Sequence, residues 1–524
     1  MKRNHITEII VVLAVLAMLL SACGSGNETP QAAEGTATTE LTEATEIPDS
    51  ESEAVASDNA EAGSSEGTDD PQGNPPGDPP DGNGGPGETP PDGGNGGPDG
   101  TPPGDPPSGG MPGGPGGSSA DIDYSGAVEI NSADTQIGQI YASTTADESA
   151  LLISTDAEVT VTDPTVTKTG NSDGGDNCNF YGLNAAVLVK DGATVTITGG
   201  TITSDASGAN GVFCYGGNGG QNGASGDGTT LVIRDTEITT TGSGSGGIMT
   251  TGGGVTYAYD MTVTTSGQSS AAIRTDRGGG TVYVDGGTYT SNGLGSPAIY
   301  STAEIHVANA TLVSNLSEGV CIEGVNSIEL TDCDLTANNT KCNGNATFYD
   351  TIMIYQSMSG DADSGTSSFT MTSGSLTSKN GHVFHVTNTN AVITLKNVQI
   401  INEDADNILL SVCADGWSGG SNTATLNAFA QVLSGAIKVG SDSTLTLNLT
   451  EGSSFTGSID GSIVNATGAT VSSEVGTVSV TLDDSSTWTL TGDSYVTEFN
   501  GDAANIISNG YTLYVNGVAL TGMK

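Results

Sequence analysis

The chain has 524 residues and is strongly acidic, with 61 Asp and Glu against 12 Lys and Arg and a formal net charge of -49 at pH 7. Binding to phosphate backbones requires clustered basic residues, so the composition excludes nucleic acid as a partner. An excess of negative charge suits a protein that stays soluble outside the cell.

The first residues have the pattern of a secretory signal. Lys2 and Arg3 precede an apolar run over residues 9–20, which is followed by Ser21 and Ala22. The apolar run is too short to span a bilayer comfortably, and small residues follow it where a signal peptidase would cut. We therefore predict a signal peptide over residues 1–22.

The end of this segment, Leu20-Ser21-Ala22-Cys23, resembles the lipobox of bacterial lipoproteins. The resemblance implies that the Cys23 thiol is lipidated and that Cys23 becomes the new N-terminus. Several acyl chains on one residue hold a protein to a membrane better than a single chain does. The expected location is the outer face of the cell membrane, exposed at the cell surface. The alternative is an ordinary secretory signal with an incidental cysteine.

Residues 23–120 form an acidic segment rich in Pro and Gly. They hold 17 of the 19 prolines and 19 Asp and Glu but no Lys or Arg, and the first aromatic residue of the chain is Tyr124. Such a segment repels itself and has too few apolar side chains to build a core. We predict a disordered linker that acts as a stalk or as a spacer without fixed geometry.

From about Ile122 the chain alternates apolar and polar residues, as in Val159-Thr160-Val161 and Val195-Thr196-Ile197, which indicates strands with one buried face. One template recurs nine times: apolar, any, apolar, four of any kind, apolar. Its last position is occupied by Val166, Ile202, Ile238, Val263, Tyr289, Leu312, Leu335, Leu376 and Ile400. The spacing gives a period of 23 to 26 residues with three longer intervals.

The longer intervals coincide with Gly-, Asn- or Asp-rich stretches at residues 171–182, 216–228 and 338–347, which we predict to be inserted loops. A further apolar strand precedes each template, so every repeat holds three strands. A coil of this kind buries its apolar face only by stacking on the next coil. We predict an all-β, single-stranded parallel β-helix over residues 121–524, which begins with a cap over residues 121–145 and ends in a hairpin around Asn516-Gly517.

In period and pattern, residues 150–480 resemble the right-handed, pectate-lyase-like β-helix superfamily, which includes bacterial adhesins. The resemblance implies a right-handed helix. It says less about function, because one fold supports many sites.

Six cysteines remain after Cys23, and their spacing contains no metal-type pair. We expect most of them to be buried single thiols, although export permits disulfides. These residues are Cys178, Cys214, Cys321, Cys333, Cys342 and Cys413.

In this superfamily, the residue after the inward anchor of the first strand points outward and stacks in a row along the axis. We predict that this row consists of Cys214, Met249, Arg274, Tyr300, Glu323, Tyr355 and His385. Aromatic faces and charged donors along a groove suit a sugar chain. The candidate ligand-binding residues are therefore Arg274, Asp276, Tyr300, Glu323, Tyr355 and His385. The alternative is a solvated sheet surface with large side chains paired between coils.

Enzymatic activity is the competing prediction. The resemblance implies proton abstraction by Arg274, with Asp276 available to Ca²⁺, but the lyase and hydrolase motifs of the superfamily are missing, and His382 with His385 is weak support for a metal site. We predict a non-enzymatic surface lipoprotein without a cofactor, an adhesin or glycan-binding protein. Its partner would be a polysaccharide or a surface glycan or protein, and it would touch the membrane through its lipid alone. The alternatives are a polysaccharide lyase or hydrolase using Arg274, Asp276 and Glu323, and a structural fibre.

Overall fold

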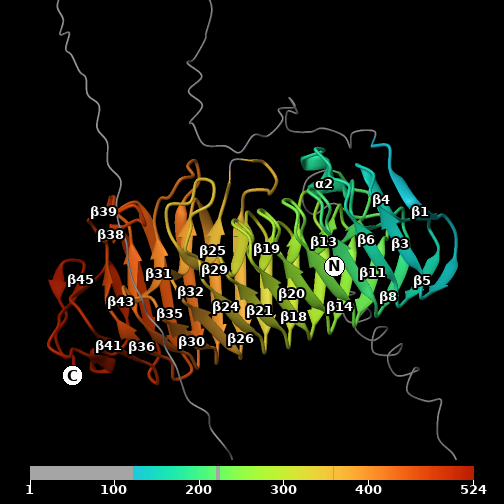
Figure 1. The fold of residues 1–524 in the computed structure, drawn as a ribbon. Coiled ribbons are helices and arrows are strands. Elements are labelled where there is room, and N and C mark those ends of the chain that lie inside the picture. The colour runs from blue at the N-terminus through green and yellow to red at the C-terminus, as the bar shows by residue number, and fades with distance from the viewer. Residues whose placement is uncertain (1–121, 220–224, 358) are drawn as a thin grey trace, which may run out of the picture. The chain divides into compact units, whose positions relative to one another are not determined.

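The computed structural model describes residues 122–219, 225–357 and 359–524. The predicted signal peptide, Cys23 and the predicted linker lie outside these residues. The described residues belong to one compact unit. They form the predicted right-handed parallel β-helix, in which three strands of each coil fall on three long parallel sheets (Figure 1).

Sheet A contains the first strand of each coil and has 13 strands. These are β1 (Ser125–Ile130), β4 (Glu148–Ser154), β7 (Val187–Lys190), β10 (Val212–Tyr215), β13 (Ile248–Thr251), β16 (Ile273–Thr275), β19 (Ile299–Ser301), β22 (Val320–Glu323), β25 (Asp350–Tyr355), β28 (His382–Thr387), β31 (Ile408–Val412), β34 (Ala436–Val439) and β37 (Ile459–Asp460).

Sheet B contains the second strand of each coil and has 14 strands. These are β2 (Asp134–Ile137), β5 (Glu158–Thr162), β8 (Thr194–Thr198), β11 (Thr230–Arg234), β14 (Val255–Tyr259), β17 (Thr281–Asp285), β20 (Glu304–Ala308), β23 (Ser327–Thr331), β26 (Thr366–Thr372), β29 (Thr389–Lys396), β32 (Asn422–Phe429), β35 (Ser443–Thr450), β40 (Thr477–Leu482) and β43 (Glu498–Asn500).

Sheet C contains the third strand of each coil up to β30, and a separate four-stranded sheet D begins at β33. The strands of sheet C are β3 (Ile140–Ser143), β6 (Thr165–Lys168), β9 (Thr201–Ser204), β12 (Glu237–Thr240), β15 (Thr262–Thr265), β18 (Thr288–Ser291), β21 (Thr311–Ser314), β24 (Asp334–Ala337), β27 (Ser375–Ser378) and β30 (Gln399–Asn402). The strands of sheet D are β33 (Val432–Ser434), β36 (Ser454–Gly457), β41 (Thr487–Leu490) and β44 (Ile506–Ile507).

The core runs along the inside of the coils. The apolar positions of the sequence template, such as Val159, Val161 and Val166, point inward and are buried in one continuous cluster. Parallel pairing keeps each of them above its counterpart in the previous coil, for example Val166 beside Ile202. The template therefore marks the positions that stack between coils, which is why it predicts the fold.

The turn between sheets B and C explains the four unspecified positions of the template. Its residue with positive φ is Asp, Asn or Gly in most coils, for example Asp163 (φ 48°), Asp235 (φ 52°) and Asn309 (φ 55°). Asp and Asn tolerate the left-handed region better than other residues with a Cβ do. This local choice turns the chain onto the next sheet in each coil.

The three predicted insertions lie between strands, as expected, although residues 220–224 of the second lie outside the described residues. The first insertion holds the short helix α2 (Asp176–Tyr181) where we predicted a loop. Residues 121–145 were predicted to cap the helix, and from Ser125 they instead supply the first strand of all three sheets. Smaller elements complete the chain: β38 (Ile463–Val464), β39 (Thr470–Ser472), β42 (Ser494–Val496), the 3₁₀-helix η1 (Ala503–Asn505), β45 (Leu513–Val515) and β46 (Val518–Ala519).

The predicted C-terminal hairpin is confirmed. Strands β45 and β46 are antiparallel, and Asn516 (φ 47°) and Gly517 (φ 77°) form the turn between them. The six cysteines after Cys23 are free thiols, and all except Cys342 are buried. Among the described residues, no helix has the length and apolar character needed to cross a membrane.

Candidate functional site

The outer face of sheet A holds the predicted binding residues, but they form two rows and not one. Arg274 pairs with Tyr300, and Tyr300 pairs with Cys321, not with Glu323. The first row contains Phe213, Met249, Arg274, Tyr300, Cys321, Met353, His385 and Ser411. Glu323 and Tyr355 pair with each other in a second row, two residues further along their strands.

The prediction failed where a strand has apolar residues on both faces. Val320-Cys321-Ile322-Glu323 and Ile352-Met353-Ile354-Tyr355 each contain two apolar residues that could be the inward anchor of the strand. The prediction took the second one, Ile322 or Ile354, and therefore placed the following residue, Glu323 or Tyr355, in the outward row. Cys214 was misplaced for the same reason, since it points into the core and Phe213 occupies the outward position. Alternation assigns a face to a residue only where the two faces differ in polarity.

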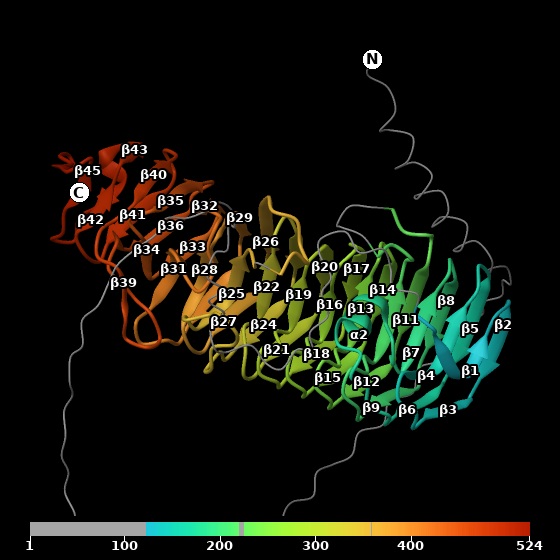
Figure 2. The same cartoon turned by 90° about the horizontal axis from the view of Figure 1, so that it is seen from above.

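The N-terminal part of this face is covered by α2. Two side chains of α2 pack with neighbouring residues, most of them on sheet A, in an apolar cluster that is separate from the core. The cluster consists of Leu152, Phe180, Tyr181, Ala185, Leu188, Phe213, Tyr215 and Met249. Tyr181 packs edge-on against Tyr215, with ring centroids 5.8 Å apart. This stretch of sheet A is therefore buried on both of its faces, and both views show α2 next to β13 (Figure 1 and Figure 2).

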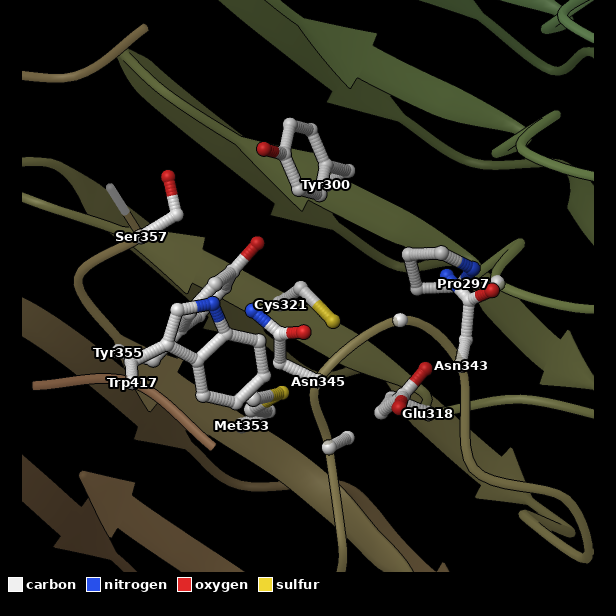
Figure 3. A pocket seen from close by; sticks show the side chains of 13 residues that line it. Pro297, Tyr300, Glu318, Cys321, Asn343, Asn345, Met353, Tyr355, Ser357 and Trp417 are labelled. Carbon is white, nitrogen blue, oxygen red and sulfur yellow. The ribbon is translucent and has the colours of Figure 1, made fainter. Parts of the chain in front are cut away.

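A pocket of about 220 Å³ opens on the central part of the face, over β19, β22 and β25. Figure 3 shows Tyr300 on one side, Trp417 and Tyr355 on another, and Glu318 with Asn343 at the opposite end, with the sulfurs of Cys321 and Met353 between them. The lining residues are Gly295, Pro297, Tyr300, Glu318, Cys321, Asn343, Gly344, Asn345, Ala346, Met353, Tyr355, Ser357 and Trp417.

Glu323 orders the aromatic side of the pocket. Its Oε2 atom accepts hydrogen bonds from the hydroxyl groups of Tyr300 (2.5 Å) and Tyr355 (3.1 Å), and its Oε1 atom accepts one from Ser357. Burial and the nearby Glu323 carboxylate raise the pKa of both tyrosines well above the usual value, so both phenols stay protonated and donate. Tyr355 also contacts Trp417, with ring centroids 4.9 Å apart. Glu323 thus fixes two of the aromatic rings.

Arg274 and Asp276 form an ion pair at the edge of the pocket, and the Arg274 guanidinium lies 5.3 Å from the centre of the Tyr300 ring. Burial raises the pKa of Asp276 to about 6, although the Arg274 guanidinium acts in the opposite direction. Both side chains are largely buried, with 15% and 3% exposed. Arg274 is therefore engaged by protein groups and holds Tyr300 in place.

Arg277 connects the covered and the open parts of the face. Its guanidinium lies 4.2 Å from the centre of the Phe180 ring of α2 and 2.6 Å from Asp361 Oδ1, in the segment after β25. Sequence analysis gave no role to this residue, because its two partners are distant in the sequence.

His385, predicted to lie in the groove, is buried under the insertion before β25. Its side chain is 0% exposed, with the Phe348 ring 4.6 Å from its own. Its Nδ1 atom lies 2.7 Å from Ser411 Oγ, and its Nε2 atom lies 3.4 Å from Asp415 Oδ2. The prediction that His385 binds ligand is therefore corrected: this histidine belongs to a buried network.

The same network joins two walls of the pocket. Asp415 Oδ1 accepts hydrogen bonds from the backbone nitrogen (2.9 Å) and hydroxyl (2.6 Å) of Thr347. A Cβ at Gly416 would lie 1.8 Å from the carbonyl oxygen of Asn345, so only glycine permits this approach. Ser411, His385 and Asp415 contain the groups of a nucleophilic triad, but their burial denies a substrate access to them.

A second hollow of about 550 Å³ adjoins the first, and Ser357 lines both. Apart from Ala362 and the glycines, the residues that line it are polar and uncharged. The lining consists of Gln356, Ser357, Gly360, Ala362, Ser364, Gly365, Asn388, Thr389, Asn390, Ser418, Gly419, Gly420 and Ser421. The amide oxygen of Gln356 is buried there and has no hydrogen-bond partner among the described residues.

Residues that sequence reasoning missed, namely Glu318, Asn343 and Asn345, come from a turn and from the third predicted insertion. The Asn-rich composition of residues 338–347 was the available signal, but nothing in the sequence placed the insertion over sheet A.

In the part of the chain that the structure describes, no group of three His, Cys, Asp or Glu residues is arranged to hold a metal ion. No protein-family model, no curated protein and no solved structure matches this chain.

Proposed function

We propose that this chain is a surface lipoprotein, lipidated at Cys23 and carried on an acidic stalk, whose β-helix binds a glycan. The observation that carries the proposal is the pocket lined by Tyr300, Tyr355 and Trp417, with the Asn345 amide beside Trp417 and Asn343 at the opposite end (Figure 3). Aromatic rings pack against the apolar faces of sugar rings, while amide and carboxylate groups bond to hydroxyls.

The size of the two hollows supports an oligosaccharide. The first hollow, about 220 Å³, lies below the range of roughly 300 to 1,000 Å³ for drug-sized ligands and suits one sugar residue. The second, joined to it at Ser357, offers amides and hydroxyls to a neighbouring residue of the same glycan. An adhesin that recognises a short stretch of a surface polysaccharide fits both features.

The engagement of Arg274 favours binding over cleavage. A lyase that uses Arg274 as its base needs the guanidinium to reach the substrate, whereas this guanidinium donates to Asp276 and packs on Tyr300. The resemblance to pectate-lyase-like proteins therefore supports the fold and the use of this face, and the binding function rests on the pocket.

The test is to screen the full chain against an array of surface and plant glycans, and to measure the affinity of each hit by calorimetry. Trp417→Ala is expected to weaken binding at least about tenfold, a loss of roughly 1.4 kcal/mol. Tyr283→Ala is the matched control, because Tyr283 is an exposed aromatic residue on sheet B, outside the pocket. The Tyr283→Ala variant should bind the glycan with the same affinity as the unmodified chain.

The same glycans should be followed for reducing ends and for unsaturated products. Turnover that disappears in Arg274→Ala would replace the binding function with the lyase alternative. A chain that binds none of the glycans would favour the structural fibre.

A further inference from the structure

The charge of the pocket indicates which kind of sugar it accepts, and this inference rests on the proposed glycan-binding function. Among the described residues that line the pocket there is one acidic side chain, Glu318, and no lysine or arginine. Glu318 is 5% exposed, and its carboxyl group accepts a hydrogen bond from Ser317. This carboxyl group has no cationic partner among the ion pairs of the described residues.

Near the pocket, two further buried acids have no cationic partner among the residues that the structure describes. Within the described residues, the Glu323 carboxyl group accepts its side-chain hydrogen bonds from hydroxyl groups. Asp350 is 1% exposed, both of its carboxyl oxygens lack a hydrogen-bond partner within the described residues, and burial, followed by the neighbouring Glu318, raises its pKa well above the usual value. Ionising a buried carboxyl group without a cationic partner is costly, and a ligand that supplies positive charge offsets this cost.

The aromatic residues on the other side also favour a cation. Tyrosine and tryptophan faces attract ammonium groups, most strongly where water is excluded. The nearby cation Arg274 does not cancel the acidic character, because Asp276 already pairs with it. Burial raises the pKa of Glu318, and an ammonium group beside it would favour the ionised carboxylate.

We propose that the pocket selects a sugar residue with a free, positively charged amino group, as in a de-N-acetylated amino sugar, over neutral and uronic-acid residues. The ammonium group would lie toward Glu318 and Asn343, and the sugar ring would lie against Trp417 and Tyr300. This specificity is opposite in charge to the uronate expected of a pectate-lyase-like site.

A matched series of tetrasaccharides tests the proposal on the unmodified full chain. Glucosamine tetramer, N-acetylglucosamine tetramer and cellotetraose share their linkage and differ at C2, and tetragalacturonate supplies negative charge. Calorimetry should give the glucosamine tetramer an affinity at least about tenfold above that of cellotetraose, with tetragalacturonate the weakest. Equal affinities for the glucosamine tetramer and cellotetraose, or tightest binding of tetragalacturonate, would overturn the inference but leave glycan binding in place.

The variant Glu318→Gln tests whether Glu318 produces the preference for a positively charged sugar. This variant keeps the size and hydrogen bonding of the side chain, so the glucosamine preference should fall to within about threefold while binding of cellotetraose persists. A preference that survives in a folded Glu318→Gln protein would contradict the assignment. If the variant does not fold, the tetrasaccharide series on the unmodified chain still decides the proposal. Failure of all four sugars and of the array would refute the proposed function itself.

Discussion

Two stretches of the outer face of sheet A, built on the same register, have opposite properties. From Leu152 to Met249 the outward side chains are apolar and lie under α2, whereas from Arg274 to Tyr355 they are charged, aromatic or sulfur-containing and most of them line a pocket. The strands of the two stretches pair in the same way. The difference teaches that the inserted segments, and not the coils, decide which part of a uniform β-helix is available to a ligand.

The largest expected effect comes from breaking the covered stretch. Phe213→Ala removes a fully buried ring beneath α2 and should lower the free energy of unfolding by about 3 to 5 kcal/mol, because burial is lost and a cavity remains. Denaturant titration followed by circular dichroism measures this change. Phe213→Leu, which keeps most of the apolar volume, should cost clearly less. Equal effects of the two substitutions would indicate that the cluster is not tightly packed.

A smaller expected effect is the loss of folding stability at low pH, which involves the buried histidines beside Phe348. Burial, followed by the neighbouring His385, lowers the pKa of His382 to about 3. Below about pH 6.5 the unfolded chain therefore binds a proton that the folded chain refuses, so stability falls as the pH drops toward 3. At pH 5 this amounts to about 2 kcal/mol, at roughly 1.4 kcal/mol per pH unit.

His382→Gln should remove that part of the pH dependence. The comparison is the urea midpoint of the two proteins at pH 7 and at pH 5, where the unmodified chain should lose more stability than the variant. Parallel losses in the two proteins would mean that His382 is accessible to protons in the folded state.

The smallest expected change in the free energy of unfolding comes from a substitution between the two stretches of sheet A. Arg277→Ala removes the contact with Phe180 and the ion pair with Asp361, which together should contribute about 1 kcal/mol because both charged side chains are partly exposed. Hydrogen exchange should become faster in residues 176–181. The matched control is Arg234→Ala, which removes a similar contact with Tyr259 on sheet B. If both variants leave α2 unchanged, Arg277 does not couple it to the open stretch.

The sequence predicts the fold well because the β-helix repeats one local requirement. Residues such as Val159, Val161 and Val166 must be apolar in each coil, and the turn that follows favours Asp, Asn or Gly, so the pattern recurs at a readable spacing. After Ile400 the template becomes harder to find. The interval from Leu449 to Phe455 is one residue longer than that from Val161 to Val166, and sheet D begins in this region.

The site was predicted only in part, for physical reasons. Arg274 and Tyr300 were placed correctly because each follows a clear inward anchor, whereas Cys321 and Met353 lie in strands that are buried on both faces. The cover over His385 depends on how residues 338–349 and 413–417 pack together, through contacts such as Thr347 with Asp415. Contacts across 68 residues leave no periodic trace in the sequence.

The most direct test of the central claim is hydrogen exchange of the full chain with and without a saturating tetrasaccharide, the tightest binder of the glucosamine series. If the open stretch of sheet A binds the glycan, protection should be confined to residues 295–300, 318–323, 343–357 and 413–421, while α2 and sheet B exchange as before. Protection centred on the exposed Tyr283 of sheet B, or no change at the pocket despite measurable binding, would contradict the account.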